Sequence, residues 1–480
     1  MTDRGVHGSM SRSMTSAYIQ APTIFVIFGA TGDLARKKIL PALYHLFSIG
    51  ALPKRFHIVG FSRQPLSHAD YQARITEALQ EKGGVVASPE TLKQFLACVT
   101  YQSGQFLVAE DYGGLLAHVN SIDEKWGMCT NKLYYLSVAP QLYQAIFQNM
   151  AARGLNVGCD PKGAWTRVLV EKPFGKDAHT AAELDVQLGS IFEESQIYRL
   201  DHYLAKEIMQ NILAFRFSNN LFEHSWDHTA IEKVEMRIFE SIGVEGRGGF
   251  YDMNGALRDV GQNHLLQMLA LIAMEHPERY EADLIRQRRT EVLSQLRVLT
   301  MDEIIHRTSR KQYEGYREIS GVDPGSHTET AFRVEARLDT PRWKNVPFIL
   351  EAGKRMPEER KEVAVTFRHP SPCLCPVGEG HVQNRLIFTL GPEEKITIEF
   401  WSKKPGLNFE VEPRSFEFQL QSQNGAGVAE YEKLLLDAIV GDQTLFVRTD
   451  EIQAMWRFID PIVEAWARNH VPLEMYKPSA

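Results

Sequence analysis

The stretch from Thr23 to Ala35 reads TIFVIFGATGDLA, and it decides the fold of the first part of the chain. Its apolar run predicts a strand over Thr23 to Phe28, and a helix is expected over Leu34 to Ser48. The turn between them has the pattern Gly-x-x-Gly-x-x-Ala, in which glycine permits a tight turn and close backbone approach. A helix N-terminus directly after such a turn offers free N–H groups to a diphosphate.

The turn therefore predicts a dinucleotide site, with a glycine turn that binds no ligand as the alternative. The candidate cofactor-binding residues are Gly29, Ala30, Thr31, Gly32, Asp33 and Leu34. The next expected strand ends in Ser62-Arg63, where an NAD-selective site has a carboxylate for the ribose hydroxyls. A guanidinium instead suits a 2′-phosphate, so Arg63 favours NADP unless it is a solvated loop arginine.

Short apolar runs alternate with amphipathic segments up to about residue 200. Further strands are expected at His57 to Phe61, Lys132 to Val138 and Arg167 to Val170, and helices at Gln141 to Arg153 and Thr180 to Phe192. Strand, helix and strand in succession predict a parallel sheet covered on both faces. Residues 22–200 are thus expected to form an α/β, doubly wound, Rossmann-like domain that binds NADP.

After residue 230 the sequence pattern changes and predicts longer strands with alternating polarity. They are expected at Val234 to Phe239, Ala331 to Leu338, Val363 to Phe367, Arg385 to Leu390, Ile396 to Phe400 and Phe416 to Leu420. Helices at Leu257 to Met274 and Ala429 to Ile439 could cover one face. Residues 201–480 are expected to form an α+β domain with a large, mainly antiparallel sheet, which serves substrate binding and oligomerisation.

The composition excludes several classes of protein. The formal net charge of −7 argues against an extended nucleic-acid or anionic-membrane surface. No run reaches the ~18 apolar residues of a spanning helix, and no secretion signal opens the chain. We expect a soluble, cytoplasmic protein whose residues 1–21 form a disordered or tag-like tail.

The cysteine content is low. Five cysteines suit a reducing compartment better than a disulfide framework. Cys373-Leu374-Cys375 lacks a second pair of ligands at zinc spacing, so no metal site is expected.

The segment Arg199 to Glu207, RLDHYLAKE, places an acid, an imidazole, a phenol and an ammonium close together. If it is helical, His202 and Lys206 lie four apart on one face and can hold one phosphate. The alternative is an interdomain helix with surface charges.

Four other motifs accompany this segment: VEKPFG at residues 170–175, EGRGGFYD at 245–252, RDVGQNHLLQ at 258–267 and GKRM at 353–356. Together with YEKLLLD at 431–437, they make the chain resemble the glucose-6-phosphate dehydrogenase family from residue 23 to about 470. The resemblance implies NADP-dependent oxidation of glucose 6-phosphate to 6-phosphogluconolactone, the first step of the oxidative pentose phosphate pathway. It also implies a homodimer or homotetramer.

The resemblance also implies residue roles. His264 would be the general base and Asp201 would orient it, which suits an imidazole that titrates near neutral pH. The substrate-binding residues would be Lys172, His202, Tyr203, Lys206, Glu240, Asp259, Lys354 and, as a weaker transfer, Lys361. Lys172 would contact the cofactor as well. Without the resemblance, His264 reads more simply as a core histidine and Asp259 as a partner of Arg258.

Two departures from the family pattern are visible. Ala205 stands where glycine is usual, and Pro140 is a single proline where two are common. Two rival functions stay open. One is a different sugar oxidoreductase of the glucose–fructose oxidoreductase type, and the other is a catalytically silent NADP-sensing or scaffold protein.

Overall fold

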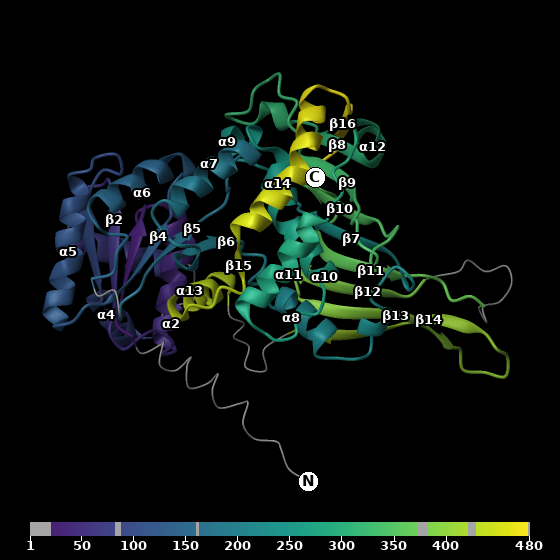
Figure 1. The fold of residues 1–480 in the computed structure, drawn as a ribbon, viewed down its shortest axis with the longest axis horizontal. Helices are drawn as coiled ribbons and strands as arrows, with labels where there is room; N and C mark the ends of the chain where they lie inside the picture. Colours follow the sequence, from purple (N-terminus) through teal and green to yellow (C-terminus); the bar gives the residue numbers. More distant parts are fainter. Residues whose placement is uncertain (1–20, 82–87, 160–162, 373–382, 421–428, 479–480) are drawn as a thin grey trace, which may run out of the picture. The chain divides into compact units, whose positions relative to one another are not determined.

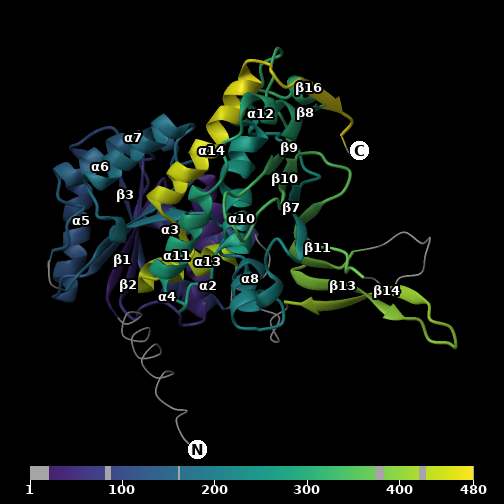
Figure 2. The ribbon, with the colours of Figure 1, turned by 45° about the vertical axis from the view of Figure 1, so that its right-hand side comes forward.

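The computed structural model describes residues 21–81, 88–159, 163–372, 383–420 and 429–478. The chain divides into two compact units (Figures 1 and 2). The first comprises Met1–Gly175, His179–Ala205 and Val428–Arg448, and the second comprises Lys176–Ala178, Lys206–Gly427 and Thr449–Ala480. The expected tail over residues 1–21 lies almost wholly outside the described residues.

The first unit is built on a seven-stranded sheet in the order β15-β6-β5-β4-β1-β2-β3. All neighbouring strands are parallel except β15, which is antiparallel to β6. The central strand β1 is buried along its whole length, which requires helices on both faces. The strands are β1 (Thr23–Phe28), β2 (Phe56–Ser62), β3 (Val99–Ser103), β4 (Asn131–Leu136), β5 (Thr166–Val170), β6 (Ile197–Leu200) and β15 (Phe446–Val447).

The helices of this unit begin with a π-helical turn, η1 (Ala35–Ile39), that continues directly into α2 (Leu40–Ser48). The single helix expected over Leu34 to Ser48 is therefore two consecutive helical segments. The other helical segments are α3 (His68–Glu81), α4 (Pro89–Ala97), α5 (Asp111–Trp126), η2 (Pro140–Leu142), α6 (Tyr143–Ala152), α7 (Ala178–Gly189), η3 (Glu194–Gln196) and α13 (Glu430–Val440).

A late segment of the chain, residues 428–448, returns to the first unit. Its strand β15 extends the sheet beside β6, and α13 packs against α2 (Figure 1). Arg167 on β5 donates to the carbonyl oxygens of Ala438 and Ile439 at 2.7 and 2.9 Å, which satisfies the last turn of α13. The sequence analysis placed these residues in the second domain, so this return is a difference from the expected division.

The second unit is built on a nine-stranded sheet in the order β14-β13-β12-β11-β7-β10-β9-β8-β16. It is mainly antiparallel, as expected, but β10 with β7 and β16 with β8 are parallel pairs. The strands are β7 (Ile231–Phe239), β8 (Thr308–Tyr313), β9 (Ala331–Ala336), β10 (Phe348–Gly353), β11 (Arg360–Phe367), β12 (Arg385–Gly391), β13 (Lys395–Lys403), β14 (Val411–Gln419) and β16 (Leu473–Tyr476).

Helices cover one face of this sheet. The fully buried α10 (Leu266–Ala273) continues the π-helical η5 (Leu257–Leu265), which packs on β10 and β7. Helix α11 (Ala282–Ser294) lies between α10 and α14 (Thr449–Ala467), while α8 (Glu207–Phe217) packs on β12. The shorter segments are η4 (Glu223–Ser225), α9 (Gly248–Asp252), α12 (Met301–Arg307) and η6 (Tyr316–Glu318).

Two findings bear on the expected class of protein. Among the described residues, no helix is both long and apolar enough to cross a membrane. Cys129 and Cys159 form a disulfide, whereas the sequence analysis expected no disulfide framework. Cys98 is free, and Cys373 and Cys375 lie outside the described residues.

Candidate active site

The glycine turn closes tightly against β2 and the segment after β4. Gly29 has φ 79°, and its N–H donates to the Phe61 carbonyl at 2.9 Å. A Cβ at Gly29 would lie 2.2 Å from the Ser137 carbonyl oxygen, so only glycine fits. The Gly32 N–H donates to the Gly29 carbonyl at 2.9 Å, and η1 begins at Ala35. The turn thus brings bare backbone to the start of a helix, as diphosphate binding requires.

The other residues of the turn fix its position. The Thr31 and Ser62 hydroxyls share a hydrogen bond of 2.8 Å that ties the turn to the end of β2. Ala30 is buried, while Asp33 is exposed and pairs with Lys37 at 3.0 Å. The hydrogen bond from Lys37 lowers the pKa of Asp33 below its usual value.

Arg63 follows β2 directly and is exposed to solvent. Within the described ranges, its guanidinium has no hydrogen bond or ion pair. It stands at the end of the strand that neighbours β1, where a dinucleotide-binding sheet places the residue that reads the ribose. Arg63, predicted for the 2′-phosphate, therefore lies at the same edge of the sheet as the glycine turn.

The segment from Asp201 to Lys206 is not helical, and this corrects the expectation that His202 and Lys206 share a helix face. Strand β6 ends at Leu200, a turn follows, and α8 begins only at Glu207. The Asp201 carboxylate accepts the Tyr203 N–H at 3.0 Å, which directs the backbone into a turn. The boundary between the two units also falls here, between Ala205 and Lys206.

The candidate residues of the first unit all lie at one edge of its sheet. Gly29, Arg63, Lys172 and Asp201 come directly or within two residues after strands β1, β2, β5 and β6, which run parallel. Ligands of open parallel sheets bind at this carboxyl edge. Lys172 is half-buried and precedes a cis proline, Pro173.

The half-buried Glu171 carboxylate is connected to His202 through Tyr431 at the same edge. The Glu171 side chain accepts hydrogen bonds from the Tyr135 and Tyr431 hydroxyls at 2.6 and 3.3 Å. Burial raises the pKa of Glu171 above its usual value. The ring of Tyr431 stacks on the His202 imidazole, with centroids 6.3 Å apart and an interplanar angle of 19°. The sequence analysis assigned neither Glu171 nor Tyr431 a role, although both lie inside quoted motifs.

In the second unit, His264 lies in the π-helical η5 and is buried. Its backbone N–H donates to the Asn263 side chain at 2.7 Å. Asp259 lies in the same π-helix, which is a form often found at functional sites. Burial raises the pKa of Tyr251 well above its usual value, and the Asp259 carboxylate adds to this effect.

Glu240 and Lys354 meet at the ends of the parallel strands β7 and β10. The Lys354 ammonium binds the Glu240 carboxylate, and the Glu240 N–H donates to the Gly353 carbonyl at 2.9 Å. The ammonium also lies 6.0 Å from the ring centre of Tyr251. Two predicted substrate ligands are therefore paired, and Tyr251 connects them to the neighbourhood of Asp259.

The remaining two lysines lie near the turn that joins β12 to β13. The Lys206 ammonium is 3.5 Å from the Glu394 carboxylate, which also caps α8 by accepting the Ile208 N–H at 3.0 Å. Lys361 on β11 opposes Gly391 at the end of β12 and pairs with Glu359 at 2.7 Å. The sequence analysis did not anticipate Glu394, because no motif includes it.

One unit has a glycine turn at the carboxyl edge of a parallel sheet, and the other has imidazole, carboxylate and ammonium side chains; both features are typical of two-domain nicotinamide-dependent dehydrogenases. The family model described as glucose-6-phosphate dehydrogenase, NAD binding domain, matches residues 26–211, and the model of the C-terminal domain of the same enzyme matches residues 213–480. The chain therefore belongs to the glucose-6-phosphate dehydrogenase family, which confirms the resemblance carried by its motifs.

Individual relatives agree with the family models. A glucose-6-phosphate 1-dehydrogenase of Aggregatibacter actinomycetemcomitans is 41% identical over 456 residues, which cover 92% of this chain and 91% of that protein. One of Treponema pallidum is 39% identical over 477 residues, covering 95% and 91%.

Solved structures agree as well. Glucose-6-phosphate dehydrogenase in complex with its substrate glucose-6-phosphate matches with a TM-score of 0.86 at 29% identity, over 96% of both chains. The glucose-6-phosphate 1-dehydrogenase of Mycobacterium avium matches with a TM-score of 0.81 at 30% identity, over 96% of this chain and 95% of that one. The expected fold class is thus confirmed in both parts.

Proposed function

We propose that the chain oxidises glucose 6-phosphate at C1 to 6-phosphoglucono-1,5-lactone with NADP as the hydride acceptor, and that the residues described above carry the reaction. The observation that supports this most strongly is that each unit gathers its predicted residues locally. The first unit collects the cofactor candidates at one sheet edge, and the second collects Glu240, Lys354 and Asp259 around Tyr251.

The first unit fits NADP. The bare Gly29 backbone and the N-terminal end of η1 suit the diphosphate, and Arg63 is available for the 2′-phosphate. Lys172, at the end of β5, is proposed to contact both the cofactor and the sugar. When bound, NADP supplies the electrophilic ring that takes a hydride from C1.

The chain's own residues are proposed to supply binding, orientation and proton transfer. His202, Tyr203 and Lys206 bind the substrate phosphate, since imidazole, phenol and ammonium groups can all donate to its oxygens. Glu240, Asp259 and Lys354 hold the sugar hydroxyls, with Lys361 as a further ligand. His264 accepts the proton of the O1 hydroxyl as C1 loses its hydride, and the Asp201 carboxylate stabilises the resulting imidazolium.

The proposal is tested by following NADPH formation with purified protein. We expect rapid formation with glucose 6-phosphate and NADP, a large loss when glucose replaces glucose 6-phosphate, and a smaller rate with NAD. Equal rates with glucose and glucose 6-phosphate would favour the other sugar oxidoreductase. Tight NADP binding without NADPH formation would favour the alternative of a catalytically silent NADP-sensing or scaffold protein.

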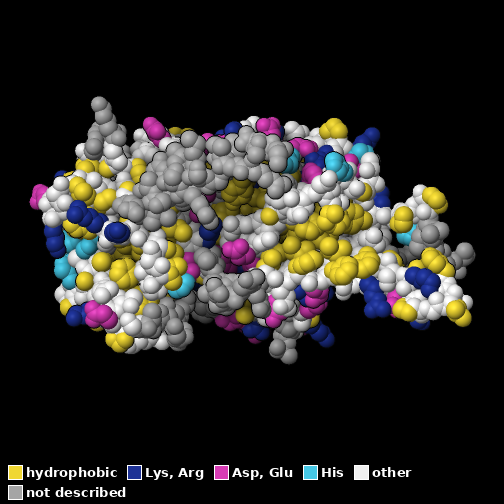
Figure 3. Space-filling model, turned by 90° about the horizontal axis from the view of Figure 1, so that it is seen from below, with side chains coloured by type: hydrophobic (Ala, Val, Ile, Leu, Met, Phe, Trp, Pro, Cys, Tyr) yellow, Lys and Arg dark blue, Asp and Glu magenta, His cyan; other side chains and the backbone are white. Residues whose placement is uncertain are grey.

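We propose that the chain also associates with itself through the sheet of the second unit. Phe416 and Phe418 on β14 are 60% and 58% exposed. They pair across the sheet with Ile398 and Ile396, and this apolar face is buried at Phe388 on β12. Figure 3 shows hydrophobic side chains gathered on the second unit, seen from the side of β13 and β14. A second copy would cover apolar area that the helices leave open.

Light scattering after size exclusion tests this association. We expect the mass of a homodimer or homotetramer, and its loss in Phe416→Asp with Phe418→Asp. A monomeric wild-type protein would contradict the proposal.

We place the activity in the cytoplasm, because a phosphorylated sugar does not cross membranes unaided.

A further inference from the structure

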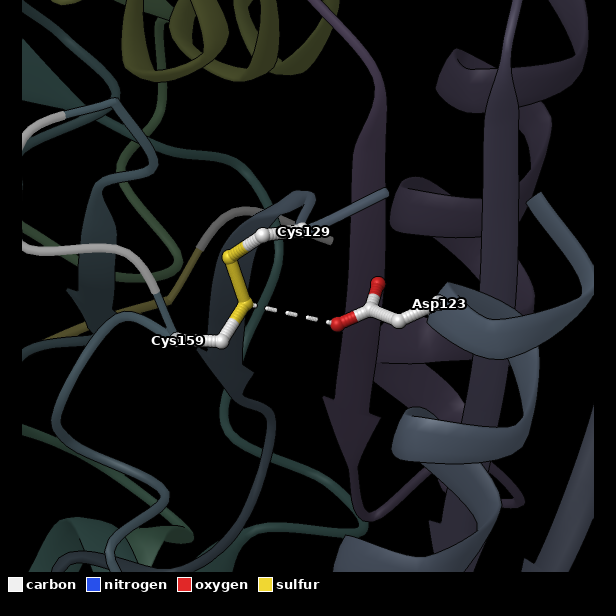
Figure 4. Close-up of side chains that lie close together, drawn as sticks. All are labelled: Asp123, Cys129 and Cys159. Atoms are coloured by element: carbon white, nitrogen blue, oxygen red, sulfur yellow. Dashed lines mark hydrogen bonds between the residues drawn. A yellow bond between two sulfur atoms is a disulfide. The ribbon is translucent and has the colours of Figure 1, made fainter. Parts of the chain in front are cut away.

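A second cluster of reactive groups lies at the amino ends of the strands in the first sheet, whereas the glycine turn lies at their carboxyl ends. Cys129 immediately precedes the β4 region, and Cys159 follows α6, and the two are joined as a disulfide with Cα atoms 5.8 Å apart. Asp123 on α5 reaches the Cys159 sulfur at 3.5 Å (Figure 4). Cys159 is exposed and Cys129 is half-buried, so Cys159 is the more accessible of the two residues.

We propose that Cys129 and Cys159 form a redox-active site that exchanges reversibly with small disulfides and dithiols, with Cys159 as the attacking thiol and Cys129 as the resolving thiol. The proposal is independent of the dehydrogenase reaction, since neither cysteine belongs to the cofactor or substrate residues.

A buried lysine supplies the charge that such a site needs. The Lys132 ammonium lies 3.8 Å from the Cys159 sulfur and is held by the Asp123 carboxylate at 2.7 Å. Two further hydrogen bonds, to the Thr130 carbonyl at 2.7 Å and the Thr130 hydroxyl at 2.9 Å, fix its position. A fixed ammonium beside a sulfur stabilises the thiolate, which is the nucleophile in exchange.

Asp123 fixes the position of Lys132. Its carboxylate lies 3.5 Å from the Cys159 sulfur and holds the Lys132 ammonium in place beside that sulfur. Cys98 offers a natural comparison, because its thiol donates to the Gln94 carbonyl at 3.5 Å and burial raises its pKa. Cys98 should therefore react slowly.

The exchange balances without any other reactant. The Cys159 thiolate attacks one sulfur of a small disulfide, whose S–S bond breaks and releases one thiolate that takes a proton from water. The Cys129 thiolate then attacks the Cys159 sulfur in the mixed disulfide and releases the second small thiol. The protein dithiol is oxidised to a disulfide, and one small disulfide is reduced to two thiols.

The bond closes a loop that carries part of the cofactor edge. The two cysteines are 30 residues apart, and the segment between them contains β4, α6 and Ser137, whose carbonyl packs against Gly29. A crosslink across this segment restricts its opening, because it removes conformations from the unfolded loop. Reduction is expected to speed amide hydrogen exchange in β4 and α6, and to leave the second unit unchanged.

The test equilibrates the full chain with mixtures of oxidised and reduced dithiothreitol, alkylates the free thiols and maps them by mass spectrometry. We expect Cys129 and Cys159 to lose alkylation together as the mixture becomes oxidising, while Cys98 stays alkylated. In the Cys159→Ser variant, Cys129 should stay alkylated throughout. A Cys159 that remains alkylated in every mixture, as Cys98 does, would overturn the proposal.

A kinetic arm tests the role of Lys132. In the reduced protein at pH 7, we expect Cys159 to be alkylated faster than Cys98, and Lys132→Met to slow Cys159 about tenfold, as one unit of thiol pKa implies. Lys132→Arg keeps the cation and should stay within about threefold of the wild-type rate. Loosened packing alone would expose Cys159 and speed its alkylation in Lys132→Met, and that result would overturn the role of Lys132.

Discussion

Lys354 and Glu240 form an ion pair at the ends of two adjacent parallel strands, β10 and β7, with side chains only 12% and 18% exposed. Each group holds the other in place before any sugar binds. A pair that is already oriented loses less entropy when it binds a ligand than two free side chains would.

Glu240→Gln should therefore raise the KM for glucose 6-phosphate. Loss of a charged hydrogen-bonding partner costs about 1.5–3 kcal/mol, which corresponds to roughly 10- to 100-fold. The matched control is Glu245→Gln, which removes the partner of Arg355 at an exposed pair in the same unit. That change should alter KM less than about fivefold. Similar increases in the KM for glucose 6-phosphate in Glu240→Gln and Glu245→Gln would show that Glu240 affects KM through the stability of the fold and not through sugar binding.

Gly29→Ala should weaken NADP binding. An alanine there meets the Ser137 carbonyl oxygen and the Val138 side chain, so the turn must move. A displacement near 1 Å is enough to raise the KM for NADP at least about tenfold. Gly50→Ala is the matched control, since Gly50 has a similar φ of 71° with nothing within 4 Å. It should cost about 1 kcal/mol of stability and leave the KM for NADP unchanged.

Arg63→Asp should raise the KM for NADP roughly 10- to 100-fold and change the KM for NAD less than about threefold, because only NADP carries the 2′-phosphate. Arg55→Asp, at the other end of the same strand, changes the same charge away from the cofactor edge. It should preserve the ratio of the two KM values. Equal effects of Arg63→Asp on both cofactors would remove its assignment.

Asp437 makes stability depend on pH. Burial raises its pKa to about 7 despite the nearby Lys433, and within the described residues its Oδ2 atom has no hydrogen-bond partner. Because the folded state holds this proton more tightly than the unfolded state, whose pKa is about 4, the contribution of Asp437 to stability falls as pH rises from about 4 to 7.

The corresponding measurement compares the free energy of unfolding at pH 5 and pH 8. We expect the wild type to lose more stability over this interval than Asp437→Asn, by a difference on the order of 2–3 kcal/mol. Asp302→Asn, whose side chain is 86% exposed on α12, should behave like the wild type. The same pH dependence in wild type and Asp437→Asn would reject the assignment.

Much of the fold could be predicted where local patterns and tertiary packing agree. Strand β1 matches its expected range from Thr23 to Phe28, because every residue of that apolar run is buried. Strand β8 was missed because its sequence, TSRKQY, lacks clear alternation and gains its place through pairing with β9 and β16. Such pairing partners are distant in sequence and invisible to a local pattern.

The site shows the same limit. The sequence shows the residue types of the segment from Asp201 to Lys206, but the helix predicted there does not form. The Asp201 carboxylate accepts the backbone N–H of Tyr203 in place of a helical carbonyl. The return of residues 428–448 to the first unit, which stacks Tyr431 on His202, depends on contacts across more than 200 residues. No sequence spacing could indicate it.

The most direct test of the central claim is the kcat of His264→Asn with saturating glucose 6-phosphate and NADP, beside His306→Asn, an exposed histidine on α12. If His264 is the general base, its replacement lowers kcat at least ~100-fold while His306→Asn retains the wild-type value. A kcat for His264→Asn within about threefold of the wild type would contradict the account.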